Sequence, residues 1–186
     1  RVLIAEHQLY SRCLADLVAE IPGILASQNR DNGRFGDGIW IVTDQNVLLP
    51  LAVAWSYADA QNPFYHRAEV LAAIVRGGDA LIAAQDANGR WIFRKKDNST
   101  WGQIYMPWTY SRWIRAYQIV RDVMPAEARE RWDRALELGY AGIARELAAT
   151  KTIANIPTHH AMGLHFAGEV FQRPEWRQLA HDFIHR

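Results

Sequence analysis

The sequence predicts an all-helical protein whose helices form two layers, an α/α toroid. Three observations lead to this fold class. Most of the 186 residues fall into segments with apolar side chains at helical spacing. Charged amphipathic segments alternate with apolar or aromatic ones. An Asn-Gly loop motif also recurs between them. With 49% hydrophobic residues, the chain can bury the core of one domain, over residues 1–186.

The first helix is expected over residues 2–20 and is amphipathic. Pro22-Gly23 is expected to end it, because proline lacks an N–H and glycine favours non-helical backbone. Residues 29–38 are rich in Asn, Asp and Gly and predict a loop. An almost wholly apolar helix follows over 44–60, in which Pro50 either kinks the helix or marks its true first turn.

The rest of the chain is predicted to be helical apart from the segment 88–103. That segment is expected to be a loop with a short strand at 91–94, and Gly77-Gly78 weaken the helix before it. The helices are expected over these ranges: 66–86, 106–122, 126–148, 157–171 and 175 onward.

The alternation of apolar and amphipathic helices suggests repeated hairpins. The sequences "DNGRF" (31–35) and "ANGRW" (87–91) are offset by 56 residues, which favours a repeat. An inner layer of apolar helices covered by an outer layer of amphipathic ones is the arrangement of an α/α toroid. An α-solenoid or an irregular helical bundle is the alternative.

Composition excludes several function classes. A formal net charge of +1 gives no electrostatic reason to expect nucleic acid or a membrane surface as partner. No apolar run reaches the roughly 20 residues that a membrane span needs. No signal segment is evident, and Cys13 is the single cysteine. Because the chain begins at Arg1 and stops within a helical pattern, we expect a piece of a longer protein, truncated on its C-terminal side.

Three polar and aromatic stretches precede the three apolar helices: 43–46, 101–110 and 155–160. Thr43 or Asp44 is a plausible N-cap for the first of these helices. In repeated hairpins all inner helices start at the same end. We therefore expect these stretches to converge on one end of the fold.

Asn, His and Tyr together suit β-elimination at a uronic acid. Removal of the C5 proton requires the adjacent carboxylate to be neutralised, which an amide or imidazole can do by hydrogen bonding. A His or Tyr can take the proton, and a Tyr or His can protonate the leaving oxygen. A neutral histidine is a competent base near pH 7, since its ordinary pKa is about 6.5.

The alternating helices, with Asn and His at an inner-helix start and a Tyr- and Trp-rich neighbouring segment, resemble the α/α-toroid polysaccharide lyases, of the heparinase II/III-like and alginate lyase families. The resemblance implies a β-sandwich domain after the toroid and a periplasmic or secreted location. It implies Asn155 as carboxylate neutraliser, His159 or His160 as base or second neutraliser, and Tyr105 or Tyr110 as proton donor. Family members often place His directly after the Asn, whereas "NIPTHH" separates them here.

The expected partner is an anionic polysaccharide or oligosaccharide. The residues expected to bind it are Gln103, Trp101, Trp108, Arg94 and Asn46. Arg94 belongs to the positive run "FRKKDNS", which is otherwise a solvated loop. We expect no cofactor and no metal site, because the adjacent His159 and His160 lack helical zinc spacing. His181 and His185 have the i, i+4 spacing but no HExxH-type acid.

Other functions compatible with the sequence remain open. A toroid glycoside hydrolase of the unsaturated glucuronyl hydrolase type needs two carboxylates, and Asp37 and Asp44 are the candidates. A sugar epimerase or a non-catalytic glycan-binding module is also possible. Asn155 can equally be a simple N-cap, and Tyr105 and Trp108 can be core residues.

Adjacent helical residues diverge by about 100°, so only one of His159 and His160 is expected to face the site. We favour His160.

Overall fold

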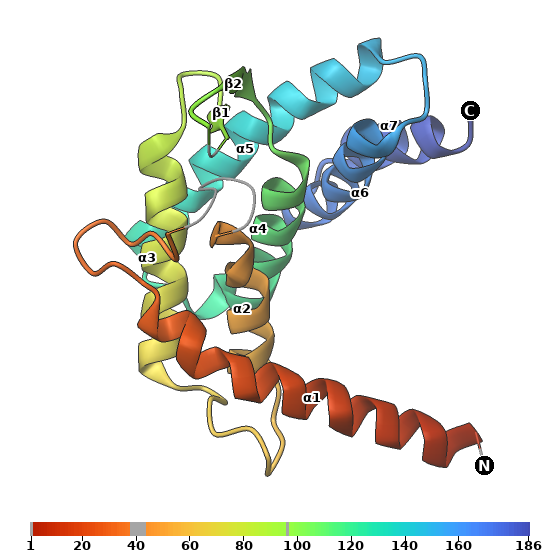
Figure 1. Ribbon diagram of the computed structural model, residues 1–186. Helices are drawn as coiled ribbons and strands as arrows, with labels where there is room; N and C mark the ends of the chain where they lie inside the picture. The colour runs from red at the N-terminus through yellow and green to blue at the C-terminus, as the bar shows by residue number, and fades with distance from the viewer. Residues whose placement is uncertain (1, 38–43, 96) are drawn as a thin grey trace.

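The computed structural model describes residues 2–37, 44–95 and 97–186, with the backbone alone for residues 2–7. Most of these residues are helical, and one two-stranded hairpin is the only sheet among them (Figure 1). The helical class predicted from the sequence is confirmed, whereas the toroid remains a prediction. Thr43, one of the two expected N-caps, lies outside the described residues.

The elements follow one another as helices interrupted by a single hairpin. Their bounds are α1 (Val2–Ala26), η1 (Asp44–Val47), α2 (Leu48–Ser56), α3 (Ala68–Ala84), β1 (Trp91–Arg94), β2 (Thr100–Ile104), α4 (Pro107–Val120), η2 (Arg121–Val123), α5 (Ala126–Ala149), α6 (Asn155–Val170) and α7 (Pro174–Ile184).

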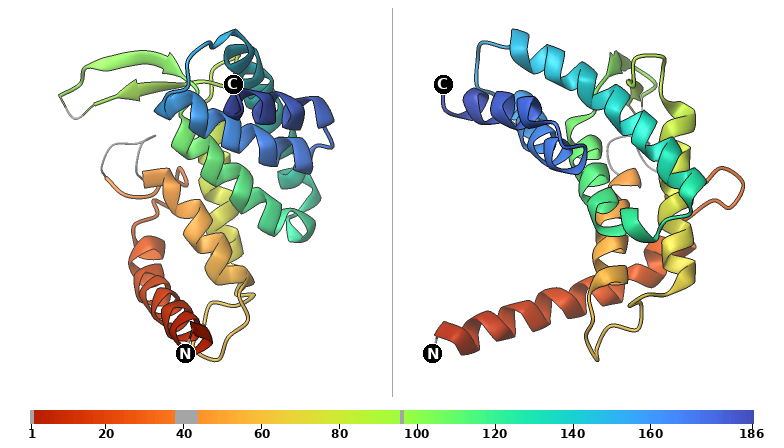
Figure 2. Two further views of the ribbon diagram at one scale, coloured as in Figure 1. Left: turned by 90° about the vertical axis from the view of Figure 1, so that its right-hand side faces the viewer. Right: turned by 180° about the vertical axis from the view of Figure 1, so that it is seen from behind.

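The expected end of the first helix at Pro22-Gly23 was wrong, because α1 continues to Ala26. Pro22 is exposed, whereas Ile21 is fully buried and Ile24 and Leu25 pack against the core. The free energy gained by burying these side chains outweighs the cost of the backbone hydrogen bond that Pro22 cannot donate. The N-terminal part of α1 extends away from the other helices (Figure 2).

Two ambiguous positions are resolved by packing. Pro50 lies in the first turn of α2, where its missing N–H costs nothing. The helix α3 runs through Gly77 and Gly78 without a break. A methyl group at Gly78 would lie 1.9 Å from the Trp132 ring, and one at Gly77 would lie 2.6 Å from the Phe35 ring. Because Gly77 and Gly78 have no side chains, the rings of Phe35 and Trp132 can pack directly on the backbone of α3.

The helices form two rows. Within one row, which we call the apolar row, α2 packs against α4 and α4 against α6. In the other, the amphipathic row, α3 packs against α5 and α5 against α7. Contacts between α2 and α3, α5 and α6, and α6 and α7 join the rows. The apolar and charged segments that alternate in the sequence are thus sorted into separate layers.

The two Asn-Gly loops are built alike. Asn29 Oδ1 accepts from the N–H of Asp31 at 2.8 Å, and Asp86 Oδ1 accepts from the N–H of Asn88 at the same distance. Each loop has a glycine with positive φ, Gly33 at 75° and Gly89 at 82°, a conformation that glycine adopts without strain.

Each of these loops leads into a buried aromatic residue, Phe35 or Trp91. Gly33 lies against the backbone of α3 and Gly89 against the backbone of α5. Each loop thus follows one long helix and packs on the next helix of the amphipathic row, which supports the repeat inferred from the sequence.

The strand expected at 91–94 is present as β1, but its antiparallel partner β2 was not predicted. Trp91 pairs with Ile104 and Phe93 with Gly102. The side chains of β1 alternate between buried and exposed, so its apolar face covers the core while its other face meets solvent. The hairpin projects from the helices and leads directly into α4 (Figure 2).

None of the helices in the described ranges is both long and apolar enough to span a membrane.

We predict that Gly139→Ala will destabilise the fold, because a methyl group there would lie 2.0 Å from the hydroxyl oxygen of buried Tyr110. Overpacking of this kind costs about 1–3 kcal/mol, measurable by urea unfolding. Gly23→Ala on α1 is the matched control, since nothing lies within 4 Å of its added methyl group. It should stabilise the helix by about 0.5–1 kcal/mol. Equal changes in the free energy of unfolding for the two substitutions would show that the Tyr110 ring does not require a glycine at position 139.

Candidate functional site

The starts of α2, α4 and α6 meet at one end of the apolar row. Thr109 Oγ1 donates to Asn46 Oδ1 at 3.3 Å, which joins η1, just before α2, to the first turn of α4. The rings of Trp108 and His159 meet edge to face, with centroids 5.9 Å apart, which joins α4 to α6. We call these four residues the rim.

His159 is half-buried at the rim, and its ring meets that of Trp108 edge to face. Within the described part of the chain, no group hydrogen-bonds to the nitrogens of this ring, so they can bond to a bound molecule. A histidine with this geometry can act as a general base or acid.

The structure buries His160, contrary to our preference for it as the residue facing the site. Its side chain is 6% exposed, and its Nε2–H donates to the carbonyl of Tyr105 at 2.9 Å. Burial lowers the pKa of His160, although the bond to Tyr105 opposes that shift. His160 is therefore a neutral anchor between α6 and the segment before α4.

The two tyrosines expected to donate a proton are core residues. The Tyr105 hydroxyl donates to the carbonyl of Asn88 at 3.0 Å, and the Tyr110 hydroxyl donates to the carbonyl of Gly89. Gln85 Nε2 also donates to the Tyr110 hydroxyl, at 2.8 Å.

Burial raises the pKa of both tyrosines, that of Tyr110 far above its ordinary value. Each hydroxyl is thus engaged within the fold, and the proton-donor role implied for Tyr105 or Tyr110 does not fit this placement.

Asn155 is exposed and is the first residue of α6, with Ala154 in the N-cap position. The N-cap interpretation of Asn155 was therefore wrong. Asn155 and His159 are four residues apart in one helix, so they lie on the same face. The carboxamide of Asn155 thus lies one turn from the His159 ring, on the side of α6 that borders the rim.

The β1–β2 hairpin adds exposed side chains next to α4. Trp101 is 62% exposed, and its ring stacks on Phe93 with centroids 4.6 Å apart. Lys95 Nζ lies 5.9 Å from the centre of the Trp101 ring. Arg94 and Gln103 are also exposed on this hairpin. An exposed indole held by a second ring and flanked by cations can stack on a sugar and attract an anion.

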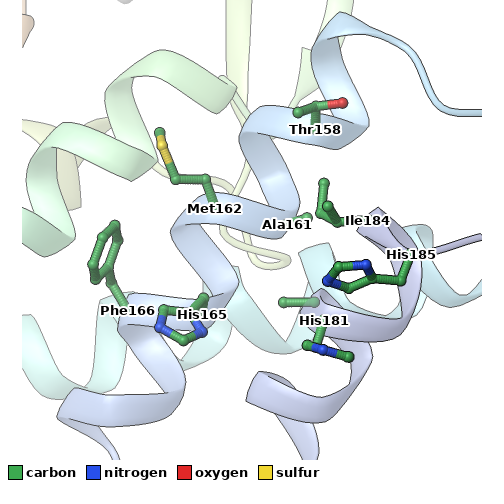
Figure 3. A pocket seen from close by; sticks show the side chains of 9 residues that line it. Thr158, Ala161, Met162, His165, Phe166, His181, Ile184 and His185 are labelled. Carbon is green, nitrogen blue, oxygen red and sulfur yellow. The ribbon is translucent and has the colours of Figure 1, made fainter.

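A separate groove lies between α6 and α7, with a volume of about 310 Å³ (Figure 3). Its lining is mainly apolar and includes His165, His181 and His185. No cluster of three or more His, Cys, Asp or Glu side chains in the described ranges has an arrangement that could hold a metal ion. None of the four rim residues lines this groove, although its lining includes Thr158, which precedes His159.

Three residues at or near the rim were not among the expected site residues, although Thr109 lies in the stretch 101–110 that was expected at this end of the fold. Thr109 binds Asn46, and Arg112 and Arg115 follow Trp108 along α4. Trp108, Arg112 and Arg115 have the spacing i, i+4 and i+7, which places them on one helix face. This spacing is visible in the sequence, whereas the pairing of Asn46 with Thr109 depends on tertiary structure.

Comparisons with protein-family models, with curated proteins and with solved structures found no match to this chain.

We predict that the burial of His160 makes stability depend on pH. Its pKa is lowered in the folded state, so the unfolded chain binds a proton more readily. The stabilisation is complete above about pH 6.5 and is lost as pH falls below it, by up to about 1.4 kcal/mol per pH unit. In His160→Gln the amide can still donate to Tyr105. When the pH is lowered from about 7.5 to 5, its free energy of unfolding should therefore decrease less than that of the wild type.

The free energy of unfolding at the two pH values measures this difference. His159→Gln is the matched control, because it removes an imidazole from the same turn and leaves the bond to Tyr105 intact. An unchanged pH dependence in His160→Gln would contradict the prediction.

Proposed function

We propose that the rim is the reaction site of a polysaccharide lyase, which cleaves a uronic-acid-containing glycan by β-elimination. The single observation that supports this most is the position of His159, an accessible imidazole packed on Trp108 where three helix starts meet. Asn46 bonds to Thr109, the neighbour of Trp108, and Asn155 lies one turn before His159 on α6. We place both carboxamides beside the His159 ring in the proposed site.

The α/α toroid belongs to the same proposal. The two rows of helices and the two similar Asn-Gly loops support it, because both features repeat hairpin by hairpin. In a toroid of such hairpins the helix starts of the apolar row form the mouth of the ring. The rim would then be part of that mouth.

The reaction can be written with one imidazole as base and acid. Neutral His159 takes the proton from C5, and the electron pair of that C–H bond forms the C4=C5 double bond. The bond from C4 to the glycosidic oxygen breaks, and the imidazolium returns the proton to that oxygen. A single group suffices when the proton and the leaving oxygen lie on the same face of the sugar.

Asn155 and Asn46 are proposed to hold the uronate carboxylate. An amide N–H bonded to a carboxylate oxygen stabilises the charge that develops there when the C5 proton leaves. The ring of Trp108 provides an apolar surface beside His159 for the sugar. Trp101, Gln103 and Arg94 on the hairpin would bind neighbouring units of the glycan.

The tyrosines and His160 have a supporting role in this proposal. Tyr105 and Tyr110 fix the start of α4 through their bonds to the 88–89 loop. His160 fixes α6 against Tyr105. They hold Trp108 and His159 in place without contacting the substrate.

A hydrolase or epimerase on the same fold would use other groups or give other products. Hydrolysis needs two carboxylates across the sugar, and Asp44, beside Gly36, is the acid closest in sequence to Asn46. A substrate of this kind is met outside the cytoplasm, so a periplasmic or secreted location is part of the proposal.

We predict that incubation with alginate, heparin or chondroitin, one polymer at a time, will raise the ultraviolet absorbance of an unsaturated uronate in at least one case. His159→Ala should lower the initial rate by a factor of about a hundred or more, the scale of a lost general base. His165→Ala, which removes another half-buried imidazole of α6, is the matched control and should keep the rate. Circular dichroism checks that both variants fold.

New reducing ends without this absorbance would assign hydrolysis instead. Full activity in His159→Ala would move the base away from the rim.

A further inference from the structure

Two arginines on α4 have no carboxylate partner in the described structure. Arg112 and Arg115 are half-buried and follow Trp108 on one helix face. None of the ion pairs between described residues includes either of them. The other arginines of comparable burial, Arg90, Arg121 and Arg131, each pair with an aspartate.

Arg115 lies where α4 meets α6, along a line that we call the seam, and Arg112 lies one turn before it on the same face of α4. The guanidinium carbon of Arg115 lies 4.2 Å from the centre of the Phe166 ring. Trp108 and His159 meet one end of this line. Arg115 and Phe166 are 51 residues apart in the sequence, and so are Trp108 and His159. Because the two contacts have the same offset, α4 and α6 run parallel. Figure 3 shows Met162 and Phe166 on α6, where both also line the groove between α6 and α7.

The seam has almost no negative charge. The helix α4 contains no Asp or Glu, and the one acid of α6 is Glu169. Glu169 Oε1 lies 3.5 Å from His165 Nε2. The net charge of the whole chain is only +1, so the excess of positive charge on the seam is a local feature.

Neighbouring groups position the guanidinium groups and leave donors available. Arg112 Nη1 donates to the carbonyl of Trp108 at 3.3 Å. Arg115 Nη1 donates to Gln118 Oε1 at 2.8 Å, while its guanidinium carbon lies over the Phe166 ring. A guanidinium has five N–H donors in a plane, so each group can still present two of them to a carboxylate.

We propose that the seam binds carboxylates of the uronic acid units next to the one at the rim. Arg112 and Arg115 are three residues apart, a rise of about 4.5 Å along α4. A glycan whose reacting unit lies between Trp108 and His159 then runs along the seam, with its following acidic units beside Arg112 and Arg115. This inference rests on the proposed function and specifies its substrate as an acidic chain of several units.

Binding without turnover tests this inference separately from the reaction. Isothermal titration calorimetry, with every protein carrying His159→Ala so that the glycan is not cleaved, would compare saturated oligouronates of one, two and four units with a neutral glucose oligomer of four units. The protein with both arginines should bind the four-unit oligouronate most tightly. Arg112→Gln and Arg115→Gln should each weaken that binding by about tenfold or more, the scale of a lost charged hydrogen bond. Binding of the single unit should change little.

Arg134→Gln is the matched control. Arg134 is an exposed residue of α5 paired with Glu130, so the substitution removes the same charge from another surface. It should leave the affinity unchanged. Arg115→Lys keeps the charge and loses the planar pair of donors, so it should restore only part of the affinity.

The outcomes separate the two proposals. Arginine-dependent binding of the four-unit oligouronate without β-elimination would support the seam and overturn the lyase. If the double variant Arg112→Gln/Arg115→Gln bound the four-unit oligouronate as tightly as the protein with both arginines, the seam proposal would be wrong. That result would hold even if the protein proved to be an active lyase. The seam would also be overturned if the neutral oligomer bound as tightly as the acidic one, or if no oligouronate bound.

Discussion

The structure depends on the burial of one phenol, that of Tyr110. Its side chain is 1% exposed, and its hydroxyl bonds both the carbonyl of Gly89 and the amide of Gln85. The ring rests on Gly139 of α5, and its own backbone carbonyl accepts from the Tyr140 hydroxyl at 2.9 Å. A buried hydroxyl must be bonded within the fold. This requirement fixes α4 relative to α5 and to the loop that follows α3.

The contacts of the buried Tyr110 also determine the geometry of the rim. Trp108 and Thr109 directly precede Tyr110, so the position of its ring determines where they emerge at the start of α4. Tyr105, three residues before Trp108, repeats the arrangement. A methyl group at Gly142 would lie 1.9 Å from its hydroxyl oxygen. The tyrosines that the family resemblance implied as proton donors are therefore the residues that align the site.

Most of the helices could be predicted from the sequence because their apolar spacing survives in the structure. The helix expected over 44–60 is a 3-10 turn followed by a shorter α-helix that ends at Ser56. Two further errors had another origin. Pro22 remained inside α1 because tertiary burial of Ile21 outweighs local propensity. The strand β2 was missed because "TWGQI" lacks the alternation of apolar and polar residues typical of a strand, and it forms by pairing with Trp91–Arg94. Tertiary packing decided the first case, and pairing with the neighbouring strand decided the second.

The choice between His159 and His160 likewise depended on a tertiary contact that the sequence pattern does not show. Both faces of α6 are apolar further along the helix, so periodicity could not choose between His159 and His160. The carbonyl of Tyr105 decides, because it accepts a hydrogen bond from His160 and so sets the rotation of α6 about its axis. Since adjacent helical residues point about 100° apart, that rotation turns His159 toward Trp108. The buried histidine and the accessible one are thus consequences of a single contact, in which one ring anchors the helix and the other is presented at the rim.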